Sequence, residues 1–133
     1  MRSLAALMLA GFTVGCGGST DSTPRDADVL GTWIVTFSST TSCSLGQIAF
    51  ILTESPTGAP TGSHGSYAIS CPGAPNDQED PGPVLNWQVS EDRFAIQVTN
   101  TPKRGLNGTV SGATMTGTFT WPSMSGTFSA AKQ

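Results

Sequence analysis

From residue 30 onward, apolar and polar side chains alternate along the chain with a period of two, and no stretch shows a helical repeat. Such alternation predicts β-strands that bury one face. The prolines of this region fall between the alternating runs, where a missing N–H removes no bond from a β-ladder. We therefore expect an all-β domain, either an antiparallel up-and-down barrel of about eight strands or a β-sandwich. The eight predicted inward faces are Trp33/Val35/Phe37, Ile48/Phe50/Leu52, Tyr67/Ile69/Cys71, Leu85/Trp87/Val89, Phe94/Ile96/Val98, Leu106/Gly108/Val110, Met115/Gly117/Phe119 and Met124/Gly126/Phe128.

The last third of the chain carries an internal repeat. Residues 106–111, 115–120 and 124–129 each read apolar, polar, Gly, Thr, apolar, polar. The spacing between repeats allows one strand and one tight turn, which is typical of consecutive antiparallel neighbours. We expect these turns at Gly112-Ala113 and at Trp121-Pro122.

Each repeat places a glycine on its apolar face, at Gly108, Gly117 and Gly126. Glycine weakens a strand unless curvature or close approach of another group requires it. We expect the three glycines to lie side by side in one layer, where they let the sheet curl tightly. The space that they leave would hold a bulky side chain from the first strands, with Trp33 as the candidate.

The composition bounds the function. The 133 residues suffice for one domain, and only 11% of them are charged. Six basic against nine acidic side chains give a net charge of −3 without a basic stripe, which argues against a nucleic-acid partner. Low charge with abundant Gly, Thr and Ser also excludes a coiled coil and is typical of all-β extracellular modules.

The predicted interior holds no charged side chain, so it offers no general acid, base or nucleophile. The single histidine, His64, has the opposite parity to Tyr67 and is expected to point into solvent. We therefore expect a protein that is not an enzyme and that has no cofactor and no metal site.

The charged residues of the predicted loops do not suggest chemistry either. The segment 76–80 contains three acidic side chains but lacks the spacing of a calcium loop, and we interpret it as a solvated loop. Arg93, Lys103 and Arg104 are scattered and are expected to serve solubility.

The N-terminus has the features of an export signal. Arg2 is followed by an uncharged run from Leu4 to Val14, which is too short to span a bilayer. The run ends in Thr13-Val14-Gly15-Cys16, which resembles the lipobox of bacterial lipoproteins. The resemblance implies that residues 1–15 are a cleaved signal peptide and that Cys16 carries fatty acyl chains such as palmitate. Since Gly17 stands where Asp signals inner-membrane retention in that family, it also implies the outer membrane of a Gram-negative cell envelope.

The lipoprotein resemblance also has consequences for the tether and for the other two cysteines. Residues 16–28 hold no large apolar side chain after the cysteine and are expected to form a disordered tether, with the folded domain at 29–133. With Cys16 lipidated, Cys43 and Cys71 remain as one pair in an oxidising compartment, and we expect a disulfide between them.

A second resemblance lies at the start of the domain. Gly31-Thr32-Trp33 resembles the G-x-W signature of lipocalins and other calycins, which implies an eight-stranded up-and-down barrel. The chain departs from that family in lacking a Thr-Asp-Tyr motif. It also lacks an arginine near the last strand to lie across Trp33, since only Lys132 follows Arg104.

Two functions fit these features. A small barrel can hold one small ligand or be filled by its own side chains. The first hypothesis is a membrane-anchored, monomeric, lipocalin-like protein that binds a small hydrophobic molecule in its interior. The alternative is an interaction module, for example a hydrolase inhibitor, with a filled core and envelope-protein partners at loops 55–66 and 72–83. The candidate ligand-binding residues of the first hypothesis are Trp33, Phe50, Tyr67, Trp87, Phe119 and Phe128.

Overall fold

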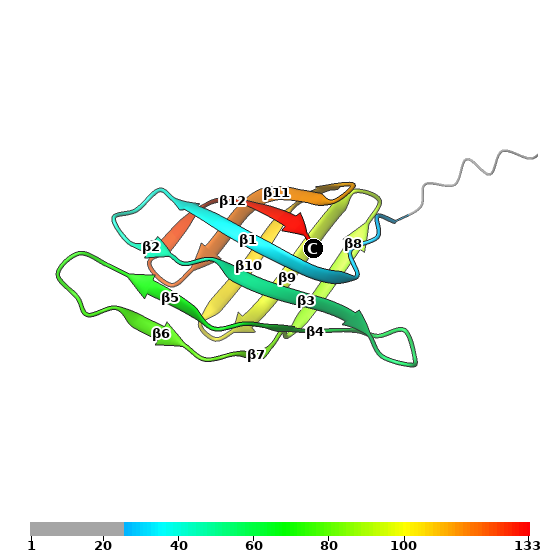
Figure 1. Ribbon diagram of the computed structural model, residues 1–133, viewed down its shortest axis with the longest axis horizontal. Coiled ribbons are helices and arrows are strands. Elements are labelled where there is room, and N and C mark those ends of the chain that lie inside the picture. The colour runs from blue at the N-terminus through cyan, green and yellow to red at the C-terminus, as the bar shows by residue number, and fades with distance from the viewer. Residues whose placement is uncertain (1–25) are drawn as a thin grey trace, which may run out of the picture.

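The computed structural model describes residues 26–133, and this part of the chain contains strands and turns but no helix (Figure 1). Nine strands form one antiparallel sheet in the order β7-β4-β3-β1-β12-β11-β10-β9-β8, and three form a small sheet in the order β2-β5-β6. The all-β prediction is confirmed. The strands are β1 (Gly31–Ser39), β2 (Ser44–Leu45), β3 (Ile48–Glu54), β4 (Pro60–His64), β5 (Tyr67–Ser70), β6 (Asp77–Glu79), β7 (Gly82–Pro83), β8 (Asn86–Ser90), β9 (Arg93–Asn100), β10 (Lys103–Ser111), β11 (Thr114–Trp121) and β12 (Met124–Lys132).

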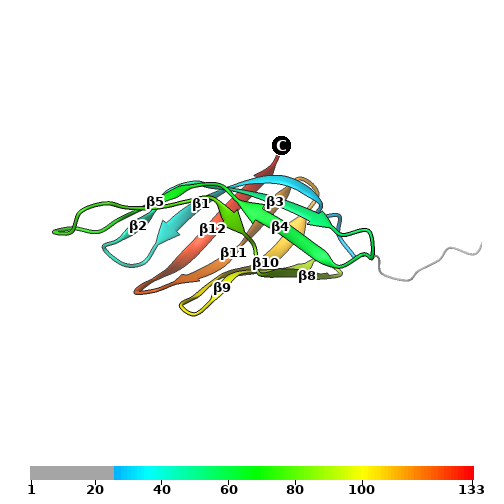
Figure 2. The same cartoon turned by 90° about the horizontal axis from the view of Figure 1, so that it is seen from below.

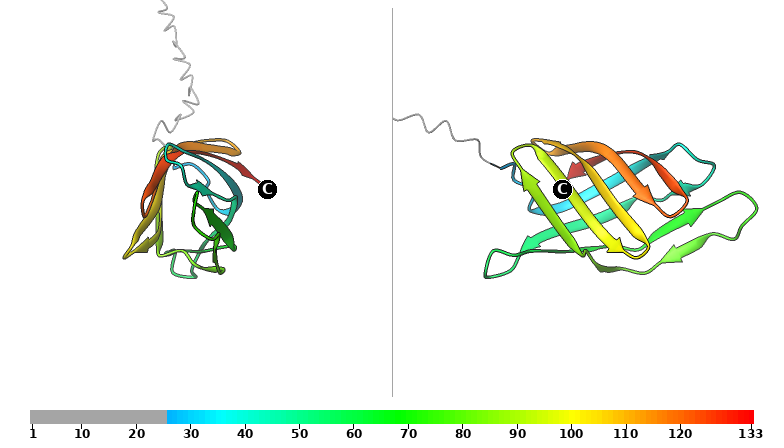
Figure 3. Two further views of the ribbon diagram at one scale, coloured as in Figure 1. Left: turned by 90° about the vertical axis from the view of Figure 1, so that its left-hand side faces the viewer. Right: turned by 180° about the vertical axis from the view of Figure 1, so that it is seen from behind.

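The large sheet curls into a half-barrel (Figure 3, left). Its ladder runs from β7 at one end to β8 at the other. From β8 to β12 each strand pairs with the next along the chain, and the internal repeat predicts this for β10, β11 and β12. β12 then pairs with β1, which brings the last strand beside the first.

All eight predicted strands are present, as β1, β3, β5 and β8 to β12, but four more strands accompany them. The predicted loop 55–66 contains β4, and the predicted loop 72–83 contains β6 and β7. These strands lack apolar alternation and form by pairing with a partner, as β4 does along β3. β5 leaves the meander and joins the small sheet with β2 and β6.

One core fills the concave side of the large sheet and extends under the small one. Most of the predicted inward positions are buried, but Leu85 is 57% exposed and the prediction for it is wrong. β8 begins only at Asn86, so its alternation does not reach Leu85. Val84 is buried instead, and its backbone N–H donates to the carbonyl oxygen of Gly62 at 2.9 Å.

The two turns of the repeat differ. Gly112-Ala113 forms the first turn as predicted, with a positive φ of 59° at Gly112. The second turn is Pro122-Ser123 instead of Trp121-Pro122, because Trp121 continues β11 and buries its indole in the core.

This one-residue shift changes the glycine layer. Gly108 pairs with Gly117, but Gly117 pairs with Phe128 and Gly126 pairs with Phe119, so the three glycines do not lie in one row. A turn at Trp121-Pro122 would have paired Gly117 with Gly126. The bulky group next to Gly126 is therefore Phe119 of the neighbouring strand, whose Cε1 would lie 2.9 Å from a Cβ built on Gly126, and not Trp33.

The predicted signal peptide and the lipidation site Cys16 lie outside the described residues. Among the described residues, contacts with the domain already occur at Asp26, three residues before the predicted boundary at Val29. The Asp26 carboxylate accepts from the backbone N–H of Glu91 at 2.7 Å, and the N–H of Ala27 donates to the Glu91 carbonyl oxygen.

Candidate functional site

The six residues predicted to bind a ligand all belong to the buried core. Each lies on an inward face, because alternation along its strand directs it away from solvent. They are Trp33 on β1, Phe50 on β3, Tyr67 on β5, Trp87 on β8, Phe119 on β11 and Phe128 on β12.

Aromatic rings in this interior pack against one another. Phe37 meets Phe119 edge to face with ring centroids 5.0 Å apart, and Phe94 meets Phe128 in the same way at 5.9 Å. Trp121, which the sequence reasoning left out of the core, contacts Phe37, Phe119 and Tyr67 at 5.9 to 6.2 Å. Edge-to-face pairs at these separations are favourable contacts that occupy the space between strands.

Five hollows among residues 26–133 are open to solvent. None of these five is lined by Trp33, Trp87 or Phe119. Phe128 lines one of about 180 Å³ with Phe37, between the exposed Thr36 and Thr127. The structure thus brings the six predicted residues together as core.

Two contacts fix the indole of Trp33, one to its N–H group and one to its ring. Its indole Nε1–H donates to the carbonyl oxygen of Val29 at 2.9 Å, and the ammonium of Lys132 lies 5.7 Å from its ring centroid. Lys132 also pairs with Asp28 at 3.2 Å. A lysine near the end of β12 thus places a cation over the ring of Trp33.

Arg104 is not the solubility residue that the sequence reasoning expected. Its side chain is only 17% exposed, and its guanidinium donates to the Tyr67 hydroxyl and to the Glu79 carboxylate, both at 3.1 Å. Its Nε is buried and has no hydrogen-bond partner among residues 26–133. Because Tyr67 and Glu79 belong to the small sheet and Arg104 to the large one, this side chain fastens the two sheets together.

Tyr67 is the centre of that junction. Its hydroxyl also lies 3.4 Å from Nε1 of Trp121, which donates to it. Burial raises the pKa of the Tyr67 phenol above its ordinary value, because a phenolate would lose solvation there, although the bonds from Trp121 and Arg104 act in the opposite direction. The phenol therefore stays protonated and neutral between its partners.

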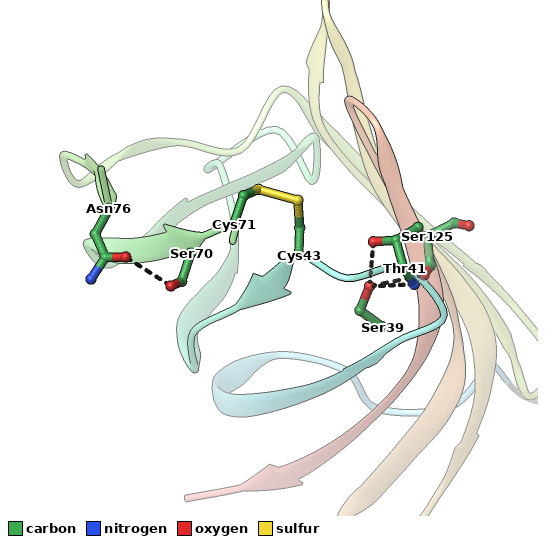
Figure 4. The surroundings of a disulfide bond; sticks show 7 residues. All are labelled: Ser39, Thr41, Cys43, Ser70, Cys71, Asn76 and Ser125. Atoms are coloured by element: carbon green, nitrogen blue, oxygen red, sulfur yellow. Dashed lines mark hydrogen bonds between the residues drawn. A yellow bond between two sulfur atoms is a disulfide. The ribbon is translucent and has the colours of Figure 1, made fainter. Parts of the chain in front are cut away.

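The predicted disulfide between Cys43 and Cys71 is present (Figure 4). Cys43 comes just before β2 and Cys71 just after β5, so the bond ties the start of the β5–β6 turn to the segment before β2. We call residues 67–79, which comprise β5, the connecting turn and β6, the arm. The Ser70 hydroxyl donates to the Asn76 side chain at 2.7 Å across the arm. Figures 1 and 2 show the arm extending beyond the end of the large sheet.

The prediction that His64 points into solvent is wrong. His64 pairs with Phe50 across β4 and β3, and directly opposite residues in an antiparallel ladder share a face. Its ring lies 5.6 Å from that of Tyr67 and 6.4 Å from that of Phe50, centroid to centroid. The parity with Tyr67 fails because β4 ends at His64 and the chain turns before β5 begins.

Residues 26–133 contain no group of three or more His, Cys, Asp or Glu side chains placed to hold a metal ion. Nor does this part of the chain have a helix that could cross a membrane. Glu79, part of the acidic segment expected to be solvated, instead forms the ion pair with Arg104.

Comparison with known proteins gave no match, whether the chain was set against family models, curated proteins or solved structures.

Proposed function

We propose that this protein is a lipid-anchored module of the cell envelope that binds another protein through its arm. The observation that carries the proposal is the contrast between the interior and the arm. The candidate ligand-binding aromatics pack against neighbouring core side chains, whereas the arm projects from the sheet, is fastened at its base by Arg104 and is cross-linked where its turn begins.

The arm has the properties of a pre-organised binding element. The Cys43–Cys71 disulfide and the bonds from Arg104 to Tyr67 and Glu79 hold it in one orientation. In its turn, residues 72–76 expose small and polar side chains. A rigid loop loses little conformational entropy when it binds, which favours affinity.

We further propose that the half-barrel closes into a lipocalin-like barrel although β8 and β4 form no β-ladder with each other. The Trp87 indole donates to the carbonyl oxygen of Thr61 at 2.7 Å, and Val84 bonds to Gly62. Both bonds connect the segment around β8 with β4. A barrel completed in this way and filled with its own side chains leaves the outer surface to carry the function.

The proposed membrane anchor is inferred from the sequence alone. The uncharged run after Arg2 and the Val14-Gly15-Cys16 ending support acylation of Cys16, and the acyl chains would hold the domain at the outer membrane. The residues between Cys16 and Asp26 would give the domain reach from the bilayer.

Site-specific photo-crosslinking in the native cell tests the proposal. A benzoylphenylalanine replaces Ala74, which is exposed in the arm, and in a matched variant replaces Ala59, which is exposed in the β3–β4 hairpin. We expect a discrete protein adduct from position 74 and none from position 59. The adduct should weaken when Cys43 and Cys71 are both changed to Ser. Equal labelling from both positions, or no adduct from position 74, would contradict the proposal.

A further inference from the structure

A groove crosses the outer face of strands β8 to β11, which face the viewer in the right panel of Figure 3. It has a volume of about 650 Å³. Its walls carry two amides, three hydroxyls and one guanidinium. These polar wall residues are Gln88, Ser90, Arg93, Asn107, Thr109 and Thr118.

The strand register explains the shape of the groove. Val89, Phe94, Gly108 and Gly117 are successive cross-strand partners and form its floor. The outward rows on either side of this line form the walls. Since two floor positions are glycines and the others point their side chains inward, the floor is backbone and C–H surface.

The wall side chains are free to bind. Within residues 26–133, none of the six forms a side-chain hydrogen bond or an ion pair with another residue. β9, β10 and β11 are each paired on both sides, so the backbone beneath the groove is already bonded. An added peptide strand would need an unpaired edge, which among β8 to β11 only β8 offers, and pairing there would extend the sheet sideways instead of filling the groove.

We propose that this groove binds a glycan chain that carries carboxylate groups. A pyranose ring has C–H faces and a rim of hydroxyls, which match an apolar floor between amide and hydroxyl walls. Among residues 26–133, Arg93 is the one charged residue that lines the groove, and a guanidinium binds a carboxylate through two parallel N–H bonds. The site is independent of the arm, which lies on the small sheet.

Calorimetric titration of the full chain in detergent with two hexasaccharides tests the assignment. The probes are hexagalacturonate, which is carboxylated, and maltohexaose, which has the same type of linkage and no charge. We expect saturable binding of hexagalacturonate and affinity for maltohexaose about ten-fold lower, because a hydrogen bond to a charged group is stronger than a neutral one. Arg93→Gln should lower the affinity for hexagalacturonate about ten-fold and leave that for maltohexaose unchanged.

Two further variants locate the site. Gln88→Ala should weaken binding of hexagalacturonate about five-fold. Asn86→Ala, an exposed amide on the same strand but outside the groove, should leave it unchanged. Absence of binding by hexagalacturonate, or an equal loss in the Asn86 and Gln88 variants, would overturn the proposal. Neither result bears on the arm, which the crosslinks at Ala74 test separately.

Discussion

Substitution of Gly117 by Ala should destabilise the domain strongly, although alanine usually stabilises a strand relative to glycine. A Cβ at Gly117 would lie 2.6 Å from the Cα of Gly108 and closer still to the carbonyl oxygen of Asn107. Ordinary Cβ contacts begin at 3.4 Å, so the new Cβ would overlap the Gly108 Cα by 0.8 Å and the Asn107 oxygen by more. Both neighbours are backbone atoms of β10, so the adjacent strand would have to move.

The expected magnitude follows from two opposing effects. Overpacking of this severity costs about 3 kcal/mol, at the upper end of the usual range. Alanine also lowers the conformational entropy of the unfolded chain, which stabilises the folded state by about 0.5–1 kcal/mol. The net loss is about 2 kcal/mol, which corresponds to a decrease of roughly 8–16 °C in Tm for a domain of this size.

Urea unfolding followed by tryptophan fluorescence measures the change, because Trp33, Trp87 and Trp121 are all buried. Gly65→Ala is the matched control. A Cβ there would make ordinary contact with Ala49 at 3.7 Å and needs no positive φ. We expect the control to be neutral or more stable by about 0.5 kcal/mol. If Gly117→Ala unfolds at the same urea concentration as the parent chain, the curl of the sheet does not depend on this glycine.

Three further results concern the arm and its junction with the large sheet. Arg104→Leu should cost about 2 kcal/mol of unfolding free energy in urea, because it removes charge-assisted bonds to Tyr67 and Glu79; a loss below about 0.5 kcal/mol would mean that these bonds do not fasten the sheets. Tyr67 is the only tyrosine, so the ultraviolet absorbance of its phenolate should titrate with a midpoint above pH 10, and a midpoint at or below 10 would contradict its burial. Its raised pKa means that its contribution to stability is fully present below pH 10 and is lost as the pH rises through the folded-state pKa. Changing Cys43 and Cys71 together to Ala should cost about 3.5 kcal/mol for a loop of 28 residues, and an unchanged urea midpoint would show that the arm is held without the disulfide.

Alternation was a reliable guide to the strands that bury an apolar face. It located β1, β3 and the five strands from β8 to β12, because burial of every second side chain dictates both the strand and its orientation. It missed β4, whose residues 60–64 read Pro-Thr-Gly-Ser-His. That strand exists because β3 offers it a ladder, which a single sequence does not reveal.

One tryptophan decided the register of the repeat. A proline after Trp121 suggested a turn at that pair, but burial of a large indole favours one more strand residue. The shift moves Gly126 opposite Phe119 and breaks the expected row of glycines. Tertiary packing therefore determined the position of this turn, and the local sequence signal did not.

The charged residues were the least predictable part of the candidate site. Arg104 and Glu79 are far apart in sequence, and neither lies in a motif. Only the pairing of β5 with β6, and the position of the small sheet beside β10, bring them to the hydroxyl of Tyr67. The same placement turns His64 toward Tyr67, against its apparent parity.

Native mass spectrometry of the protein extracted from its own membrane tests most directly whether it works through its surface with a packed interior. We expect the mass of the acylated chain, alone or in complex with a protein partner. A stoichiometric small apolar molecule that stays bound through extraction and leaves only on unfolding would contradict the packed interior. That result would favour binding of a small hydrophobic molecule by the aromatic side chains of the core.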